Sequence, residues 1–87
     1  MGYKVRVARS AEKSIAKLDL NSAAKIVEFL ESLDGIEDPR SQGKALTGNL
    51  KGYWRYRVGD YRIVCEIHDD EVIVLVVKVG HRREIYR

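Results

Sequence analysis

Apolar and polar side chains alternate at the start of the chain. Between residues 3 and 8, the apolar positions Tyr3, Val5 and Val7 are separated by basic ones. A period of two residues is typical of a β-strand, and charges on every second position favour a strand at the edge of a sheet. We therefore expect an edge strand over residues 3–8.

The period then lengthens to that of a helix. Ser10 is a candidate N-cap, and Ala11, Ile15 and Leu18 follow at a spacing of one or two helical turns, which predicts a short first helix.

A second and longer helix follows. Asn21 or Ser22 is its candidate N-cap, and Asp34-Gly35 is its predicted end. Between them runs an amphipathic apolar stripe, formed by Ala23, Ile26, Val27, Leu30 and Leu33.

Residues 37–48 have the composition of a loop, with the single proline, Pro39, two glycines and few apolar residues. Two interpretations remain open for this segment. It is an ordinary connector, or it is a mobile loop that faces a substrate, since Arg40 and Lys44 lie in it.

Three strands are predicted in the second half of the chain, over residues 53–58, 61–67 and 72–79. Gly59-Asp60 suits a two-residue hairpin turn. The last run is apolar on both faces, which is typical of a buried central strand. The prediction is one α+β domain over residues 1–87, with an N-terminal strand, a two-helix hairpin and an antiparallel meander.

The hairpin turn fixes a register in which Arg57 lies directly across from Arg62. Arg55 shares their face, and the opposite face is apolar and predicted to be the core: Trp54, Tyr56, Val58, Tyr61, Ile63 and Cys65. Like charges opposite each other destabilise a sheet. A bound anion would relieve this cost, and phosphate matches the guanidinium fork. Alternatively, the arginines extend into water. The inference depends on the register, because a shift by one residue moves the arginines to the other face.

Charge is unevenly distributed along the chain. The net charge is only +3 over 87 residues, from 16 basic and 13 acidic side chains. Acidic residues dominate from residue 10 to 39 and basic residues dominate from 40 to 62, which suggests separate faces for an anion and for solvent or a partner.

Composition narrows the class of protein. An apolar content of 45% excludes general disorder, and the longest apolar run is too short for a membrane span. The single cysteine, Cys65, has no partner for an internal disulfide, and no cysteine–histidine cluster suggests zinc. We expect a cytoplasmic domain that uses no metal and no cofactor and does not bind a membrane.

The last nine residues are the second dense group of functional side chains. His81 is the side chain that most readily exchanges protons near neutral pH, and Tyr86 is suited to stack on a base. Arg82, Arg83 and Arg87 surround them. The alternative interpretation is a solvated C-terminal strand, with His81 as a turn residue.

Three segments together resemble the RelE branch of the RelE/ParE toxin superfamily, over nearly the whole chain. They are the lead-in 46–53, the hairpin 54–64 with its Arg-x-Arg and Gly-Asp-Tyr-Arg pattern, and the ending 79–87. The resemblance implies the RelE-type fold and the toxin of a type II toxin–antitoxin system. It also implies a metal-independent endoribonuclease that cuts mRNA in the ribosomal A site through the substrate's own 2′-hydroxyl.

The resemblance assigns roles to individual residues. It implies a catalytic set made of Arg57, Arg62, His81, Arg82 and Tyr86. It implies contacts with RNA by Lys44, Lys51, Arg55, Arg83 and Arg87. The implied partners are a cognate antitoxin, the 30S A site with its mRNA and rRNA, and operator DNA through the antitoxin alone.

One departure from the family pattern concerns the proton acceptor. Relatives carry lysines on the first hairpin strand, where this chain has Arg55 and Arg57. Arginine is a poor proton acceptor, so His81 becomes the preferred acid or base, or the chemistry is slower and depends on alignment by the ribosome. Two alternatives stay open: a ParE-like inhibitor of DNA gyrase, and a catalytically weak toxin that acts mainly as an antitoxin-bound co-repressor.

Overall fold

The predicted α+β fold is confirmed by the computed structural model, which describes residues 2–83. Its main elements are β1 (Lys4–Val7), α1 (Arg9–Ala16), α2 (Leu20–Leu33), β2 (Lys44–Ala45), β3 (Trp54–Val58), β4 (Tyr61–His68) and β5 (Ile73–His81). Short 3₁₀ turns at Pro39–Ser41 and Gly48–Leu50 flank β2. Neither these turns nor the two-residue strand β2 was predicted, because the segment reads as a loop.

The strands form one sheet in the order β1-β5-β4-β3-β2. The predicted edge position of the first strand is confirmed, and β1 pairs with β5 in parallel, with Val5 beside Val74. The predicted central strand is also confirmed, since β5 lies between β1 and β4. The remaining strand pairs are antiparallel, as expected for a meander.

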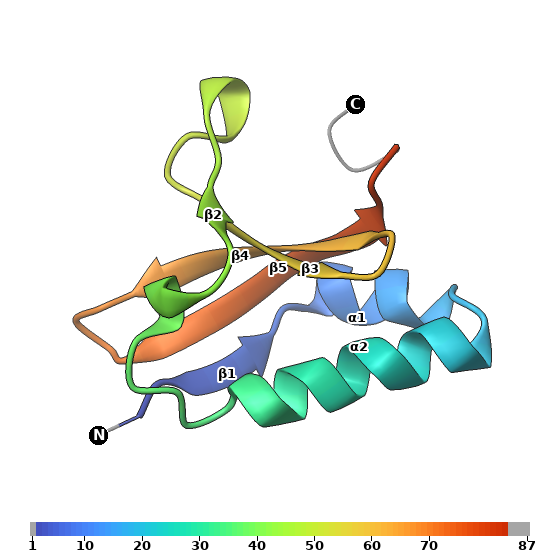
Figure 1. The fold of residues 1–87 in the computed structure, drawn as a ribbon, viewed down its shortest axis with the longest axis horizontal. Coiled ribbons are helices and arrows are strands. Elements are labelled where there is room, and N and C mark those ends of the chain that lie inside the picture. Colours follow the sequence, from blue (N-terminus) through green and yellow to red (C-terminus); the bar gives the residue numbers. More distant parts are fainter. Residues whose placement is uncertain (1, 84–87) are drawn as a thin grey trace.

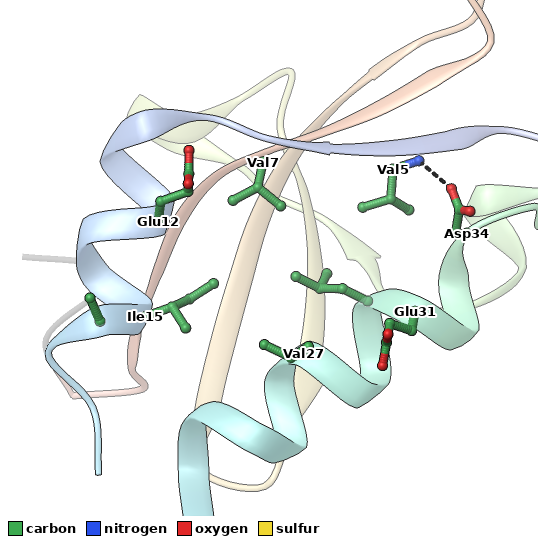
Figure 2. Close-up of a pocket in the computed structure, with 9 residues that line it drawn as sticks. Val5, Val7, Glu12, Ile15, Val27, Glu31 and Asp34 are labelled. Atoms are coloured by element: carbon green, nitrogen blue, oxygen red, sulfur yellow. Dashed lines mark hydrogen bonds between the residues drawn. The ribbon is translucent and has the colours of Figure 1, made fainter. Parts of the chain in front are cut away.

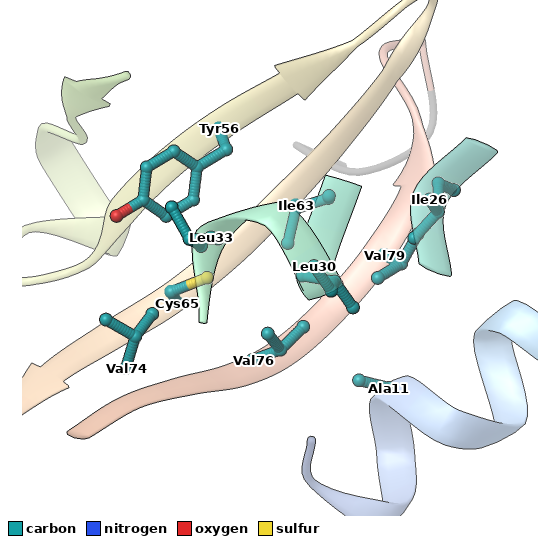
Figure 3. Close-up of a cluster of buried hydrophobic side chains, with 10 residues drawn as sticks. All are labelled: Ala11, Ile26, Leu30, Leu33, Tyr56, Ile63, Cys65, Val74, Val76 and Val79. Atoms are coloured by element: carbon teal, nitrogen blue, oxygen red, sulfur yellow. The ribbon is translucent and has the colours of Figure 1, made fainter. Parts of the chain in front are cut away.

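Both helices pack on the same face of the sheet, while the β2–β3 connection rises on the other side (Figure 1). The core lies between the helices and the sheet, where α2 contributes Ile26, Leu30 and Leu33 (Figure 3). The sheet side of this core is formed by Tyr56, Ile63, Cys65, Val74, Val76 and Val79, and α1 adds Ala11. The apolar face predicted for the hairpin is therefore the face that the helices cover.

The predicted N-caps of both helices are wrong. The first helix begins at Arg9, so Ser10 lies inside its first turn, where its hydroxyl donates to the carbonyl oxygen of Val77 at 2.8 Å. In the second helix Asp19 is the N-cap, and its carboxylate accepts from the backbone N–H of Ser22 at 3.1 Å. Hydrogen bonding to the Ser22 side chain, followed by that to its backbone N–H, lowers the pKa of the Asp19 carboxyl.

A register irregularity in β5 changes which side chains face the helices. Val64 pairs with Lys78, but the next residue, Cys65, pairs with Val76, so Val77 is an extra residue in the ladder. Such a β-bulge reverses the alternation of side chains beyond it. The consequence for the functional side chains at the end of β5 is described below.

No helix within residues 2–83 is long and apolar enough to cross a membrane.

Candidate functional site

The hairpin of β3 and β4 places three arginines on the face of the sheet that the helices leave open. Arg57 pairs with Arg62, and Arg55 pairs with Val64, which confirms the predicted register. Gly59 opens the turn with a φ of 58°, a left-handed conformation that glycine adopts without strain. We call this surface, defined by Arg55, Arg57 and Arg62, the arginine face.

Arg62 is almost completely enclosed although it carries a charge. The residue is 7% exposed, and within residues 2–83 its Nη1 atom donates two long hydrogen bonds, at 3.4 Å to the carbonyl oxygen of Gly59 and 3.3 Å to that of Tyr61. Among the described residues, its Nε atom has no hydrogen-bond partner. A buried charge without a counter-ion is costly, so an anion that accepts from this guanidinium would be stabilised.

The strand next to Arg62 places no side chain directly beside it. Gly80 of β5 lies directly across from Arg62 and carries no side chain. On the other side stands Arg57, which is exposed. Within residues 2–83, neither Arg55 nor Arg57 forms an ion pair, so both guanidiniums are available to an external anion.

The short strand β2 adds Lys44 to the arginine face. Lys44 pairs with Arg55, and directly opposed residues of a sheet share a face. The sequence predicted that Lys44 contacts RNA, but it did not predict the strand that carries it. Lys51, the second lysine predicted to contact RNA, is exposed at the end of the Gly48–Leu50 turn.

The segment that leads into β2 is held in place by side chains from the neighbouring strands. The indole N–H of Trp54 donates to the carbonyl oxygen of Gln42 at 2.7 Å, and the buried hydroxyl of Tyr56 donates to that of Pro39 at 2.6 Å. At Gly43, with a φ of 80°, a Cβ atom would lie 2.2 Å from the carbonyl oxygen of Arg55. These contacts favour the first interpretation of the segment, an ordinary connector. They hold it in the position that brings Lys44 to the arginine face.

Arg40, in the same segment, does not face the site. Its guanidinium binds Asp69 through two hydrogen bonds, at 2.9 Å and 3.1 Å, and the hydroxyl of Tyr3 donates to the same carboxylate at 2.7 Å. The bonds from Arg40 and Tyr3 lower the pKa of the Asp69 carboxyl to about 2. Arg40 thus ties the connector to the β4–β5 turn.

The structure places His81 on the face of the sheet opposite to the arginine face, so the described geometry gives no support to its predicted role as acid or base beside the arginines. His81 pairs with Tyr61, and the two rings meet edge to face with centroids 5.8 Å apart. Tyr61 lies on the helix-covered face of β4. Strict alternation from Val74 and Val76 would have put His81 on the arginine face, and the extra residue Val77 reverses this.

The same irregularity brings other basic residues to the arginine face. Val64 pairs with Arg55 on one side and with Lys78 on the other, so the side chain of Lys78 lies on the arginine face. The backbone N–H of Arg82 donates to the carbonyl oxygen of Asp60 at 2.8 Å, which continues the ladder and puts Arg82 on the same face as Gly80. Lys78 was not predicted as a site residue, although it is the one charged residue in an otherwise apolar strand.

Three predicted site residues remain, at or near the end of the chain. Arg83 is exposed beyond the end of β5, and its backbone N–H donates to Nδ1 of His81 at 3.3 Å. Tyr86 and Arg87 lie outside the described residues.

The opposite side of the molecule carries an apolar groove with an acidic rim (Figure 2). The groove, of about 740 Å³, lies between β1, α1 and α2, and its floor includes Val5, Ile15 and Val27. Val27 was predicted to be part of the buried stripe, but it is 45% exposed here. Glu12, Glu31 and Asp34 also line the groove, and Asp34 accepts from the backbone N–H of Val5 at 2.9 Å.

Comparison with known proteins identifies the family. Residues 5–86 match the family described as the ParE toxin of the type II toxin–antitoxin system parDE. The chain belongs to this toxin family. It is 36% identical over 87 residues to Toxin RelG of Mycobacterium tuberculosis, covering 100% of this chain and 99% of that protein. It is 32% identical over 85 residues to Toxin RelE of the same organism, covering 98% of this chain and 87% of the relative.

Solved toxin structures have the same fold. The toxin–antitoxin complex RelBE2 of M. tuberculosis matches with a TM-score of 0.83 and 32% identity, covering 94% of this chain and 100% of that one. The isolated E. coli RelE toxin matches with a TM-score of 0.73 and 26% identity, covering 98% and 92% of the two chains. The predicted membership of the RelE/ParE superfamily is confirmed, and the chain is a toxin of the type II toxin–antitoxin class.

Proposed function

We propose that this toxin is an endoribonuclease that cuts mRNA in the A site of the 30S ribosomal subunit. The observation that carries the proposal is the enclosed Arg62, whose Nε atom has no partner among the described residues and which stands across from Arg57. Guanidinium groups bind phosphate oxygens through paired hydrogen bonds, so this pair is suited to hold one phosphodiester.

The proposed reaction uses the 2′-hydroxyl of the substrate and no metal ion. The 2′-oxygen attacks the neighbouring phosphorus, the bond to the 5′-oxygen breaks, and the products carry a 2′,3′-cyclic phosphate and a 5′-hydroxyl. Arg57 and Arg62 would stabilise the charge that develops on the non-bridging oxygens. Arg82 would donate a hydrogen bond to the departing 5′-oxygen, and Tyr86 would stack on a base.

The other basic residues would guide the RNA to this phosphate. Arg55 and Lys78 extend the basic surface along the sheet, and Lys51 lies on the connection that rises beside it (Figure 1). Arg83 and Arg87 would contact mRNA or rRNA near the end of the chain. Because positioning supplies most of this catalysis, free RNA should be cut slowly without the ribosome.

A cognate antitoxin is the proposed protein partner, acting in the cytoplasm. It would cover the arginine face with acidic or helical segments, and operator DNA would be bound through the antitoxin. The M. tuberculosis structure named RelBE2 and the E. coli structure named RelBE are toxin–antitoxin complexes.

Inhibition of DNA gyrase is the second candidate, because the matching family is described as a ParE toxin. Mapping RNA 5′ ends after induction separates the candidates. Cuts inside translated codons are expected for the nuclease, an induced DNA-damage response would mark a gyrase inhibitor, and neither would mark a co-repressor.

The Arg62→Ala and Arg82→Ala variants test the site itself. Loss of one charge-stabilising donor should lower cleavage by about 10²–10³-fold and relieve growth arrest. Toxicity equal to that of the unchanged chain in both variants would contradict the proposal.

A further inference from the structure

Cleavage through a 2′-hydroxyl needs a group that removes its proton, and the arginine face lacks an obvious one. A guanidinium group is a poor proton acceptor, which argues against Arg55, Arg57 and Arg62 in this role. His81, the side chain first expected in this role, lies on the opposite face beside Tyr61. The inference below rests on the proposed nuclease function and asks which residue of this chain accepts the proton.

We propose that Lys44 is the catalytic base, because its position on β2 places its amine beside the arginine face. Lys44 stands directly across from Arg55 on β3, and the antiparallel register makes Arg57 its diagonal neighbour on the same face. Directly opposed and diagonal positions of a sheet lie within reach of long side chains. An amine, unlike a guanidinium, gains and loses a proton readily enough to act as a base.

The other titratable groups of this face are less well placed. Glu66 and His68 lie further along β4 and bind each other, with His68 Nε2 at 2.9 Å from Glu66 Oε1. Lys4 belongs to β1, at the far edge of the sheet. Lys78 of β5 has an interaction of its own and is separated from β2 by two strands. Lys44 is thus the amine that the strand register sets directly across from Arg55.

The anchoring of β2 gives Lys44 the fixed position that a base requires. Trp54 and Tyr56 point to the helix-covered side of β3. Their bonds hold Pro39, the first residue of the 3₁₀ turn, and Gln42, the residue that follows this turn. The close approach of Gly43 to the Arg55 backbone fixes the strand laterally. Correct placement of a reacting group contributes strongly to rate, and a displacement of about 1 Å is expected to be costly.

The proton balance of the step is simple. The neutral amine of Lys44 takes the proton of the 2′-hydroxyl as the 2′-oxygen forms its bond to phosphorus. The bond from phosphorus to the 5′-oxygen breaks, and this oxygen receives a proton from water. The Lys44 ammonium then releases its proton to solvent, so that no co-reactant besides water is needed.

The pH dependence of the cleavage rate distinguishes two roles for Lys44, proton transfer and electrostatic stabilisation by its positive charge. The full-length toxin is mixed with ribosomes carrying mRNA in the A site, and single-turnover rates are measured from neutral to strongly alkaline pH. The charged and titratable groups that neighbour Lys44 on the ladder are Arg55 directly across, with Arg57 and Tyr53 on the two diagonals. The unchanged chain should cleave faster as pH rises and then level off.

The Lys44→Arg variant keeps the charge but does not titrate in this range. We expect it to bind programmed ribosomes like the unchanged chain, to cleave about 10²–10⁴-fold more slowly, and to lose the levelling of the profile. Lys13→Arg on α1, outside the site, is the matched control and should show no change. A Lys44→Arg variant that cleaves as fast as the unchanged chain would overturn the assignment.

Chemical rescue provides an independent readout. In the Lys44→Cys variant, a methanethiosulfonate reagent attaches either an aminoethyl group, which titrates, or a trimethylammonioethyl group, whose charge is permanent. The native Cys65 is buried, and burial raises its pKa to about 12, so it should not react. Recovery of cleavage with the aminoethyl group alone supports the proposal. Equal recovery with both reagents, or recovery with neither, overturns it.

The outcomes distinguish this proposal from the function on which it rests. If the unchanged chain produces no cuts on programmed ribosomes, the nuclease function fails. If it cuts and Lys44→Arg cuts equally well, the nuclease function stands and only the role of Lys44 fails.

Discussion

Neighbouring residues of β4 serve opposite sides of the sheet. Ile63 is completely buried under the helices, whereas Arg62, one residue earlier, lies on the face that the helices leave open. Both residues are buried, but Ile63 has apolar neighbours on every side and Arg62 has a guanidinium whose Nε is unpaired within the described chain. The helix-covered face of β4 therefore stabilises the fold, while its other face carries the charge of Arg62.

The charges follow the same division. The groove between the helices and β1 has an acidic rim, with Glu12 and Glu31 along it (Figure 2). The opposite side of the sheet carries the arginine face. Nucleic acid should therefore be attracted to one side and repelled by the other. A net charge of +3 conceals this separation.

The largest expected effect on stability comes from truncating Ile63, which lies on the helix-covered face of β4. Ile63→Ala should lower the free energy of unfolding by about 2–5 kcal/mol, because it leaves a cavity among Tyr56, Val79 and α2. Urea unfolding of the purified chain measures this. Arg62→Ala serves as the matched control, and a loss of stability as large as that of Ile63→Ala would mean that Arg62 is primarily structural.

A smaller effect on stability is expected at Tyr56, because this core residue also binds the segment that leads into β2. Tyr56→Phe removes the 2.6 Å bond to Pro39 and leaves a buried carbonyl without its donor, which should cost about 1–3 kcal/mol of stability. Since this bond helps to anchor β2, cleavage should also slow. Thermal unfolding and A-site cleavage are measured on the same variant, and a stability loss without any change in cleavage would separate the anchor from the site.

The hairpin turn sets the register on which both faces depend. Gly59→Ala places a Cβ atom at a φ of 58° and should destabilise the chain by about 1–2 kcal/mol without moving the arginines to the other face. Denaturant unfolding measures the cost. Asp60→Ala, at the second turn position, is the comparison variant and should have a smaller effect.

The smallest effect concerns acid stability. The pKa of the Asp69 carboxyl is held at about 2 in the folded chain, below its usual 3.8, chiefly by its hydrogen bonds with Arg40 and Tyr3. The stability that this depression contributes is complete above the unfolded value and is lost as pH falls from about 4 to about 2. In Asp69→Asn, unfolding should show a weaker pH dependence over this interval, and an unchanged profile would contradict the role of Asp69.

Local patterns predicted the helices, the hairpin and its register, because a two-residue turn leaves one pairing for β3 and β4. The N-caps were misplaced by two or three positions, since several residues near each helix start were able to cap it. The strand β2 was not predictable from its two residues. Its position depends on tertiary bonds from Trp54 and Tyr56 to carbonyl oxygens of the connector.

The site was predicted in part. Arg57 and Arg62 were placed correctly across from each other because their strands join at a tight turn. The face on which His81 lies was not predictable, because it depends on the extra residue Val77 and the sequence of β5 is apolar on both sides of that point. The enclosure of Arg62 was also unpredictable, since alternation gives the face of a side chain and not its burial.

A double-mutant cycle tests the central claim, that Arg57 and Arg62 hold one phosphate on the open face. Cleavage of A-site mRNA is measured for the unchanged chain, Arg57→Ala, Arg62→Ala and the double variant. Each single variant should lose about 10²–10³-fold in rate, and the double variant should lose clearly less than the product of the two, because both arginines act on the same group. Losses that multiply fully, or single variants that cleave like the unchanged chain, would contradict the account.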